Sequence, residues 1–313
     1  MISTMPSHAI PKAASPDLLR DLDLTNDEVV YLLDLAAEVK RAPEVYAQAL
    51  AGKSIILLFE KPSLRTKLTF EQAIKQLGGH STCLEGPIGV REPLKDVARN
   101  LDRWFNGLVA RVFAQQTVED LARWSSVPVI NALSDAFHPC QALADVMTVR
   151  ERFGRLDGLK MAFVGDGNNV AQSLMLTSLR LGMDFSLACP EGYRPNPDVV
   201  AQAEGLAAVS GAKLAITNDP AAGVEGAHAV YTDVWASMGQ EQEAILRRKD
   251  FRDYQVNDEL FGMARPDAIF MHCLPAKRGE ETTDSVMEHE RSAIFDQAEN
   301  RMHAQKALLL MML

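Results

Sequence analysis

The chain has 313 residues, a formal net charge of −10 at neutral pH, and 47% hydrophobic against 24% charged residues. This length exceeds the roughly 250 residues at which a single core stops growing, so we expect two domains, and the acidic charge argues against a nucleic-acid partner. There is no apolar run of the roughly 18–20 residues that a membrane span needs and no secretory signal at the start, so we expect no membrane partner and a cytoplasmic location.

Short apolar runs alternate with helix-like segments along the chain, which is typical of parallel strands covered on both faces. The runs expected to be strands are 54–59, 80–85, 108–113, 127–131, 160–166, 184–190, 212–219, 228–234 and 268–275. Helices are expected between them, for instance at 64–77, 94–105, 117–124 and 171–182. The pattern predicts an α/β fold with two domains, each a doubly wound parallel sheet flanked by helices.

The first domain is expected to span 1–150 and to be completed by a C-terminal helix, 297–313, whereas the second spans 151–296. The division falls where a helical segment runs out at Phe153 and Gly154 and a new strand begins at Lys160. In open parallel sheets ligands bind beyond the carboxyl ends of the strands, so candidate site residues are expected just after each strand.

The first such segment is FEKPSLRT, residues 59–66. Ser63 suits the N-cap of the following helix, whose first N–H groups and positive dipole end favour an anion. Arg65 and Thr66 add a guanidinium and a hydroxyl there, which indicates a phosphate site. A plain helix cap beside a surface arginine would have the same sequence and stays open as an alternative. No Walker loop occurs, so ATP is not indicated.

Two further segments of the first half carry polar groups at strand ends. Arg111 lies in the apolar run LVARVF, where it either reaches water at the end of the sheet or is buried as an anion ligand. His138 and Gln141, in HPCQ, begin a helix with Pro139 at its first position. An imidazole and an amide there could bind a carbonyl oxygen and an amide, or simply cap the helix.

The segment GDGNNVAQS, 165–173, starts like a dinucleotide-binding loop, but Val170 stands where the third glycine belongs. An NAD-dependent dehydrogenase therefore stays open as an alternative. The amides of Asn168 and Asn169 could instead hold the carboxylate or amino group of a substrate.

The last three segments are DVWASMG, HCLP and AENR. Asp233 ends a strand, where its carboxylate would pair with an ammonium group, and a loop with Ser237 and Met238 follows it. Cys273 is either a buried core thiol or part of a substrate pocket. None of the four cysteines forms a C-x-x-C pair, so no metal site is expected.

Taken together, FEKPSLRT, ARVF, HPCQ, GDGNN, DVWASMG, HCLP and AENR resemble the aspartate/ornithine carbamoyltransferase family in their order, from about Leu18 to the C-terminus. DVWASMG and HCLP look like the ornithine branch. The resemblance implies transfer of a carbamoyl group from carbamoyl phosphate to ornithine, giving citrulline in arginine metabolism, without a cofactor or metal. It also implies a homotrimer, or a multiple of trimers, with active sites at subunit interfaces.

The resemblance assigns roles to matching residues. Carbamoyl phosphate would be bound by Ser63, Leu64 (through its backbone), Arg65, Thr66, Arg111, His138, Gln141, Cys273, Leu274 and Arg301. Ornithine would be bound by Asn169, Asp233, Ser237 and Met238. Catalysis would rest on Arg65, Arg111, His138, Cys273 and Arg301, with the three arginines and His138 supplying positive charge to the transition state.

Two positions depart from the family pattern S-T-R-T-R, because Leu64 and Lys67 replace a threonine and an arginine. Acetylornithine-specific relatives also carry a leucine in this motif. A carbamoyltransferase for N-acetylornithine or putrescine therefore stays open, although the Ser-Met-Gly loop favours free ornithine. A pseudoenzyme is a further alternative, but the retained arginines and histidine speak against it.

Overall fold

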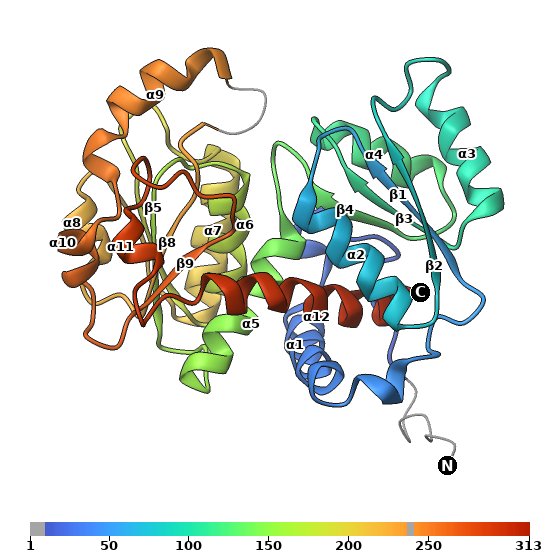
Figure 1. Cartoon of the computed structure of the whole chain (residues 1–313), viewed down its shortest axis with the longest axis horizontal. Coiled ribbons are helices and arrows are strands. Elements are labelled where there is room, and N and C mark those ends of the chain that lie inside the picture. Colours follow the sequence, from blue (N-terminus) through green and yellow to red (C-terminus); the bar gives the residue numbers. More distant parts are fainter. Residues whose placement is uncertain (1–9, 237–240) are drawn as a thin grey trace. The chain divides into compact units, whose positions relative to one another are not determined.

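The computed structural model describes residues 10–236 and 241–313. Contacts between residues divide the chain into two compact units. The first comprises the described residues up to Ala144 together with Asn300–Leu313, and the second comprises Asp145–Glu299. Each is built on a parallel sheet flanked by helices (Figure 1), so the predicted fold class is confirmed.

The division lies at slightly different residues from those expected, because it falls inside two helices. Helix α5 (Pro139–Phe153) and helix α12 (Ile294–Met312) each continue from one unit into the other. An unbroken helix offers no change of composition and no Pro- or Gly-rich linker at the crossing point, so the sequence pattern could not locate it.

In the described part of the first unit, the sheet has the strand order β2–β1–β3–β4, with all neighbours parallel. The strands are β1 (Ser54–Phe59), β2 (His80–Glu85), β3 (Gly107–Arg111) and β4 (Val129–Leu133). The helices are α1 (Asn26–Arg41), α2 (Leu64–Gln76), α3 (Leu94–Trp104) and α4 (Gln115–Trp124).

The core of the first unit follows from the period of the strands. Ile56 and Leu58 on β1 point to the same face as Leu108 and Ala110 on β3, and this face is covered by α3 and α4. Strand β2 differs because it is an edge strand whose side chains are mostly exposed. The sheet is therefore closed by helices on its faces but open along β2.

In the described part of the second unit, the strand order is β7–β6–β5–β8–β9, and again all neighbours are parallel. The strands are β5 (Lys160–Val164), β6 (Asp184–Ala188), β7 (Leu214–Thr217), β8 (Ala229–Thr232) and β9 (Ile269–His272). The helices are α6 (Asn169–Arg180), α7 (Pro197–Ser210), α8 (Pro220–Val224), α9 (Ala244–Asp250), α10 (Asp258–Gly262) and α11 (Asp284–Met287).

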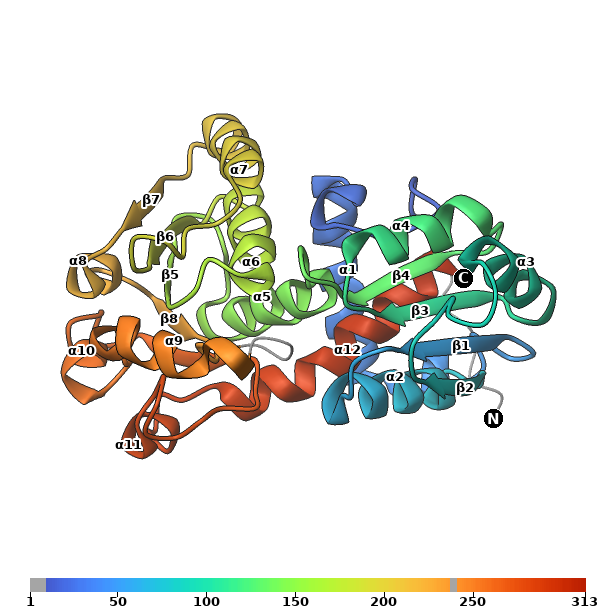
Figure 2. The same ribbon diagram turned by 90° about the horizontal axis from the view of Figure 1, so that it is seen from above.

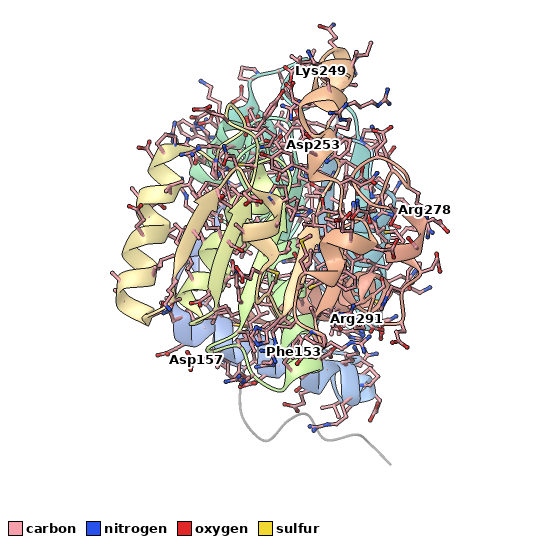
Figure 3. The ribbon with its side chains drawn as sticks, turned by 90° about the vertical axis from the view of Figure 1, so that its left-hand side faces the viewer. Phe153, Asp157, Lys249, Asp253, Arg278 and Arg291 are labelled. Atoms are coloured by element: carbon pink, nitrogen blue, oxygen red, sulfur yellow. The ribbon has the colours of Figure 1, made fainter. Side chains whose placement is uncertain are left out.

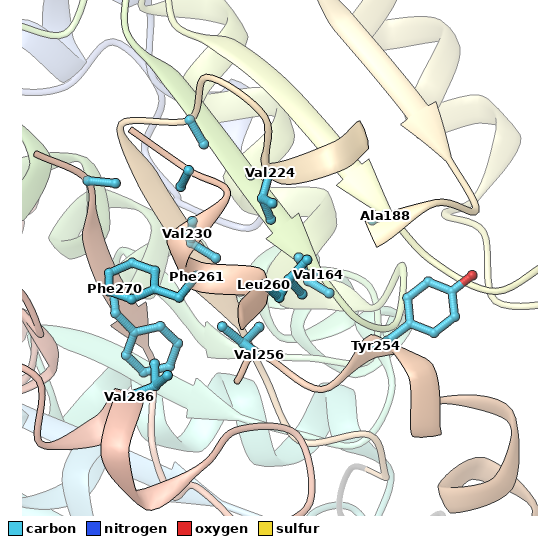
Figure 4. Packing of buried hydrophobic residues seen from close by; sticks show 14 of the residues in the cluster. Val164, Ala188, Val224, Val230, Tyr254, Val256, Leu260, Phe261, Phe270 and Val286 are labelled. Atoms are coloured by element: carbon cyan, nitrogen blue, oxygen red, sulfur yellow. The ribbon is translucent and has the colours of Figure 1, made fainter. Parts of the chain in front are cut away.

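Helices cover both faces of the second sheet. Helices α6 and α7 lie side by side on one side, and α8 and α10 lie on the other (Figure 2). On the second side, Val164 and Val230 from the strands pack against Phe261 and Val256 in a buried apolar cluster (Figure 4). Full burial of one such side chain stabilises the fold by about 1.5–3 kcal/mol.

Charged side chains lie on the outer surface of the second unit (Figure 3). Lys249, Asp253 and Arg278 are exposed examples. Among the described residues, every helix is too short or too polar to cross a membrane.

Each sheet has one point where the strand order reverses, which is the usual place for a ligand in such folds. In the first sheet β2 and β3 lie on opposite sides of β1, so the reversal lies between β1 and β3. In the second sheet β6 and β8 lie on opposite sides of β5, so it lies between β5 and β8. FEKPSLRT begins at the last residue of β1, Arg111 is the last residue of β3, and GDGNN and Asp233 directly follow β5 and β8.

Candidate active site

The start of α2, which the sequence predicts to bind an anion, has the expected Ser63 cap. The Ser63 hydroxyl accepts a hydrogen bond from the backbone N–H of Thr66 at 3.2 Å and so caps the helix. The side chain of Leu64 is 70% exposed, which leaves its backbone N–H as the group that could contact a ligand. Arg65 is half-buried in the same turn. This turn offers N–H donors, a hydroxyl and a guanidinium to an anion.

Two arginines converge on the hydroxyl of Thr66. Arg111 Nη1 donates to Thr66 Oγ1 at 3.2 Å, and Arg301 Nη2 donates to the same atom at 2.6 Å. All three residues are buried. Arg111 is therefore buried and does not reach water at the end of the sheet, and Arg301 reaches Thr66 from α12 across 235 positions of sequence.

His138 is fully buried near these two arginines. Burial, followed by the charges of Arg301 and Arg111, lowers the pKa of His138 well below its usual value. The imidazole is therefore neutral near neutral pH and can donate one N–H hydrogen bond. This pKa shift favours a neutral hydrogen-bond donor over the positive charge expected for His138, because protonation beside two guanidinium groups in a dry site is unfavourable. Gln141, one turn further along α5, is 1% exposed.

The loop before His138 is held by polar residues that the sequence analysis did not single out. The hydroxyl of Ser134 accepts from the backbone N–H of Phe137 at 3.1 Å and donates to Gln115 Oε1 at 2.6 Å. Asn131 Nδ2 donates to the same Gln115 oxygen at 3.2 Å. This network fixes the turn that precedes α5 and so orients His138.

Glu60, in the loop after β1, also holds neighbouring loops in place through hydrogen bonds to their backbone. One carboxylate oxygen accepts from the backbone N–H of Ile88 at 3.2 Å, and the other accepts from that of Phe113 at 3.0 Å. Glu60 thereby joins the FEKPSLRT loop to the loop after β3 and to the segment 85–92.

In the second unit, the two strand-end loops at the reversal point are bonded to each other. Asn168 caps α6 by accepting from the backbone N–H groups of Val170 and Ala171 at 3.0 and 3.1 Å. Its Nδ2 donates to Asp233 Oδ2 at 3.1 Å. Asn169, the residue predicted to bind ornithine, is half-buried beside this bond. Ser237 and Met238 lie outside the described residues.

Asp233 and Cys273 form the second contact of this centre. The thiol of Cys273 donates to Asp233 Oδ1 at 3.1 Å, and both residues are at most 9% exposed. The backbone N–H of Val234 donates to the same oxygen at 2.8 Å. The two strand ends, β8 and β9, therefore meet at a carboxylate suited to a cationic group. The pocket interpretation of Cys273 fits this contact better than that of an apolar core thiol.

His272 orients the HCLP turn from inside the core. Its Nδ1 accepts from the backbone N–H of Leu274 at 2.8 Å, so its Nε2 carries the hydrogen that faces Glu281 Oε1 at 3.2 Å. Leu274 has φ of 60°, a left-handed conformation that is unfavourable for a leucine. The bond to His272 helps to hold it, and Gln297 Oε1 accepts from the backbone N–H of His272 at 2.9 Å.

Within the described residues, Asp233, His272 and Cys273 could together hold a metal ion, since their ligand atoms lie within 4.8 Å of one another. Both ring nitrogens of His272 already bind other groups, however. An ion would have to displace Leu274 or Glu281 from the imidazole, so the arrangement does not favour one.

The dinucleotide alternative conflicts with the geometry of GDGNN. In nucleotide-binding loops the second glycine lets the ligand approach the backbone. At Gly167 that space is filled by the chain itself, because an added Cβ would lie 2.4 Å from the backbone nitrogen of Pro195. Gly167 N–H also donates to the carbonyl of Tyr193 at 2.9 Å. The loop is therefore packed against its own chain where a pyrophosphate would bind.

Comparison with known proteins identifies the class. Residues 16–151 match the family description "Aspartate/ornithine carbamoyltransferase, carbamoyl-P binding domain". Residues 157–312 match "Aspartate/ornithine carbamoyltransferase, Asp/Orn binding domain". The chain belongs to the aspartate/ornithine carbamoyltransferase family, and it is an enzyme of the carbamoyltransferase class.

Several of the similar proteins in this family are named ornithine carbamoyltransferase. The ornithine carbamoyltransferase of Thermococcus kodakarensis is 50% identical over 96% of this chain and 97% of its own length. The ornithine carbamoyltransferase of Thermus thermophilus is 51% identical over 91% of this chain and 93% of its own length. The solved ornithine carbamoyltransferase of Pyrococcus furiosus superimposes with a TM-score of 0.92 at 47% identity, over 96% of this chain and 97% of that one.

Proposed function

We propose that this enzyme transfers the carbamoyl group of carbamoyl phosphate to the δ-amine of L-ornithine, giving L-citrulline and phosphate. The observation that carries the proposal is the convergence of Arg111 and Arg301 on Thr66 at the start of α2. Two buried guanidinium groups at a helix N-terminus suit a phosphate dianion. The relatives' shared name favours ornithine over acetylornithine and putrescine as the acceptor.

The first substrate would be bound by the first unit's polar groups. Ser63, Arg65, Thr66, Arg111 and Arg301 would hold the phosphate, with the backbone N–H of Leu64. The neutral imidazole of His138 would donate to the carbonyl oxygen, and Gln141 would bind the carbamoyl amide. As negative charge gathers on that oxygen and on the leaving phosphate, preorganised arginines and N–H donors would stabilise it.

The second substrate would be bound by Asn169 and Asp233, which suit the α-amino and α-carboxylate groups, together with Ser237 and Met238. Cys273 and Leu274 would lie beside the reacting groups. A free amine of this type has a pKa of about 10, so the δ-amine must lose its proton before attack. The neutral nitrogen then forms a bond to the carbonyl carbon, the bond from carbon to the phosphate oxygen breaks, and phosphate leaves with a proton from the amine.

We further propose that the enzyme is a homotrimer, or a multiple of trimers. Support comes from exposed apolar side chains near the open edge strand β2. Leu84 on β2 is 51% exposed, Leu68 on α2 46%, and Val90 in the loop after β2 72%. An edge strand with apolar neighbours favours contact with another chain. Light scattering should give a native mass of about three times, or a multiple of three times, the chain's 34.4 kDa, whereas a monomer would contradict the proposal.

A cytoplasmic role in arginine biosynthesis is the expected setting. The four cysteines form no disulfide bond, which suits a reducing compartment. A relative from Pyrococcus furiosus, 48% identical over 96% of this chain, is named as the anabolic enzyme.

The direct test offers ornithine, N-acetylornithine, putrescine and aspartate separately, each with carbamoyl phosphate, and measures the carbamoylated product. We expect turnover with ornithine to exceed that with each other amine by at least about a hundredfold, because differential contacts to a substrate's polar groups reach this size. Preference for another amine would overturn the choice of substrate. A folded protein without turnover on any of them would overturn the proposed activity.

A further inference from the structure

Arg247 is the buried residue of a helix whose other side chains are exposed or half-buried. Helix α9 is short and polar, yet the side chain of Arg247 is only 8% exposed, whereas that of the adjacent Arg248 is 53% exposed. Burial of a guanidinium is costly unless partners compensate it. The partners of Arg247 therefore indicate what this burial achieves.

Those partners lie on both loops of the second unit's reversal point. Arg247 Nη1 donates to Asp166 Oδ2 at 2.6 Å and to the backbone carbonyl of Trp235 at 3.0 Å. Asp166 follows β5, and Trp235 follows β8. One guanidinium thus bonds two loops that are about seventy positions apart in sequence and adjacent in the sheet.

The guanidinium is itself held in a fixed orientation. Its Nε donates to Glu243 Oε2 at 2.9 Å, one turn earlier on the chain. The Cζ atom of Arg247 lies 5.0 Å from the ring centre of Tyr193. The hydroxyl of Tyr193 in turn donates to Asp250 Oδ2 at 2.8 Å. With an ion pair on one side and an aromatic ring on another, Arg247 has little rotational freedom.

The bonded residues stand next to the groups assigned to ornithine. Asp166 precedes Asn169 by three positions, and Trp235 follows Asp233 by two. The two loops meet again at the bond from Asn168 to Asp233. Two sets of hydrogen bonds therefore fix the separation of Asn169 from Asp233. One is the bond from Asn168 to Asp233, and the other is formed by Arg247 with Asp166 and Trp235.

We propose that Arg247 is a positioning residue for the amino-acid substrate: it fixes Asn169 and Asp233 relative to each other by bonding Asp166 and Trp235. The inference rests on the proposed function, because it assigns ornithine to these groups. No described contact joins Arg247 to Asn169, Asp233 or any other described group assigned to a substrate, so we expect it to act through the loops. Its loss should weaken ornithine binding and leave carbamoyl-phosphate binding unchanged.

The test compares Arg247→Met with Arg248→Met, which removes the same type of side chain from the neighbouring exposed position. We expect Arg247→Met to raise the KM for ornithine about tenfold to a hundredfold, in line with the loss of charged hydrogen bonds. The dissociation constant of carbamoyl phosphate should change by less than about twofold, a threshold well below one lost hydrogen bond. Arg248→Met should behave as the unchanged enzyme in both measurements, and Arg247→Lys should recover part of the loss.

A purely structural ion pair would lower the melting temperature without this selective change in KM. An unchanged ornithine KM in folded Arg247→Met, or equal loss of affinity for both substrates, would overturn the inference. If Arg247→Met does not fold, the same two measurements on Asp166→Asn test the inference, because this substitution weakens the bond between Arg247 and Asp166 at nearly constant side-chain volume. Absence of turnover in the unchanged enzyme would instead contradict the proposed function.

Discussion

Thr66 joins the two buried arginines of the first unit through a single oxygen atom. Thr66→Val keeps the shape of the side chain but removes this acceptor. A hydrogen bond to a charged group contributes about 1.5–3 kcal/mol, so we expect kcat/KM for carbamoyl phosphate to fall about tenfold to a hundredfold. Thr69→Val is the control on the same helix, since among the described residues the Thr69 hydroxyl donates to two backbone carbonyls and contacts neither arginine. Equal effects of the two substitutions in steady-state kinetics would contradict the assignment.

His138 links the chemistry of the site to the stability of the fold. Its pKa is lowered in the folded chain, so the unfolded chain binds the proton first as pH falls below about 6.5. The stabilisation from the neutral imidazole is therefore complete above that pH and is lost progressively below it, until the folded pKa is reached.

We therefore expect the melting temperature to fall less between pH 7.5 and pH 5.5 in His138→Gln than in the unchanged enzyme. The difference corresponds to at most about 1.4 kcal/mol per pH unit below 6.5. His80→Gln, at an exposed position, should keep the steeper dependence. Differential scanning fluorimetry at one protein concentration measures all three, and identical pH profiles for His138→Gln and the unchanged enzyme would refute this account.

At the level of the secondary structure, Asn168 combines two tasks that can be separated. It caps α6 and also bonds Asp233. Asn196 caps α7 in the same way, by accepting from the backbone N–H of Asp198 at 2.9 Å, but no described contact joins it to Asp233. Loss of an asparagine cap costs about 1 kcal/mol of stability.

Asn168→Ala and Asn196→Ala should therefore lower the free energy of unfolding by similar amounts. Only Asn168→Ala should raise the KM for ornithine, because only it releases Asp233 from the loop after β5. The measurement is denaturant unfolding of both variants beside their steady-state kinetics. A matching rise in ornithine KM for Asn196→Ala would show that general loosening of the unit, and not the bond to Asp233, is responsible.

The strands were predictable because parallel strands covered on both faces are continuous apolar runs, as in SIILLF. The observed strand ends differ from the expected ones by up to a few residues. For example, a strand was expected at 228–234, and the observed strand β8 spans Ala229–Thr232. The motif residues were predictable for a related reason, since caps and helix starts are local signals. Thr66 and His138 could thus be named from helix starts, and Arg111 as a charge within an apolar run, before their contacts were known.

Residues that act through partners far away in the sequence could not be found in this way, because no local pattern indicates such partners. Arg247 stands 81 positions from Asp166, and Gln297 stands 152 positions from Asp145, to which its Nε2 donates at 2.7 Å. In sequence, Arg247 is one of several charged residues on a polar helix. The lowered pKa of His138 could not be predicted either, because burial and the neighbouring arginines, which lower it, have no local signature in the sequence.

At the scale of the whole molecule, one type of parallel sheet occurs twice and carries different chemistry at each reversal point. In the first unit the strand ends gather positive charge and N–H donors around Thr66. In the second they gather oxygen acceptors and a thiol around Asp233. An anionic substrate suits the former and an amino acid with an ammonium group suits the latter, so we expect the two binding functions to be separable by mutation.

Calorimetric titration of freshly dissolved carbamoyl phosphate into Arg301→Gln and Asp233→Asn tests this division most directly. We predict that Arg301→Gln weakens binding of carbamoyl phosphate about tenfold or more, because it removes a buried charge from the phosphate site. Asp233→Asn should bind it as tightly as the unchanged enzyme does, while losing affinity for ornithine. Normal binding by Arg301→Gln, or strongly weakened binding by Asp233→Asn, would contradict the assignment of one substrate to each centre.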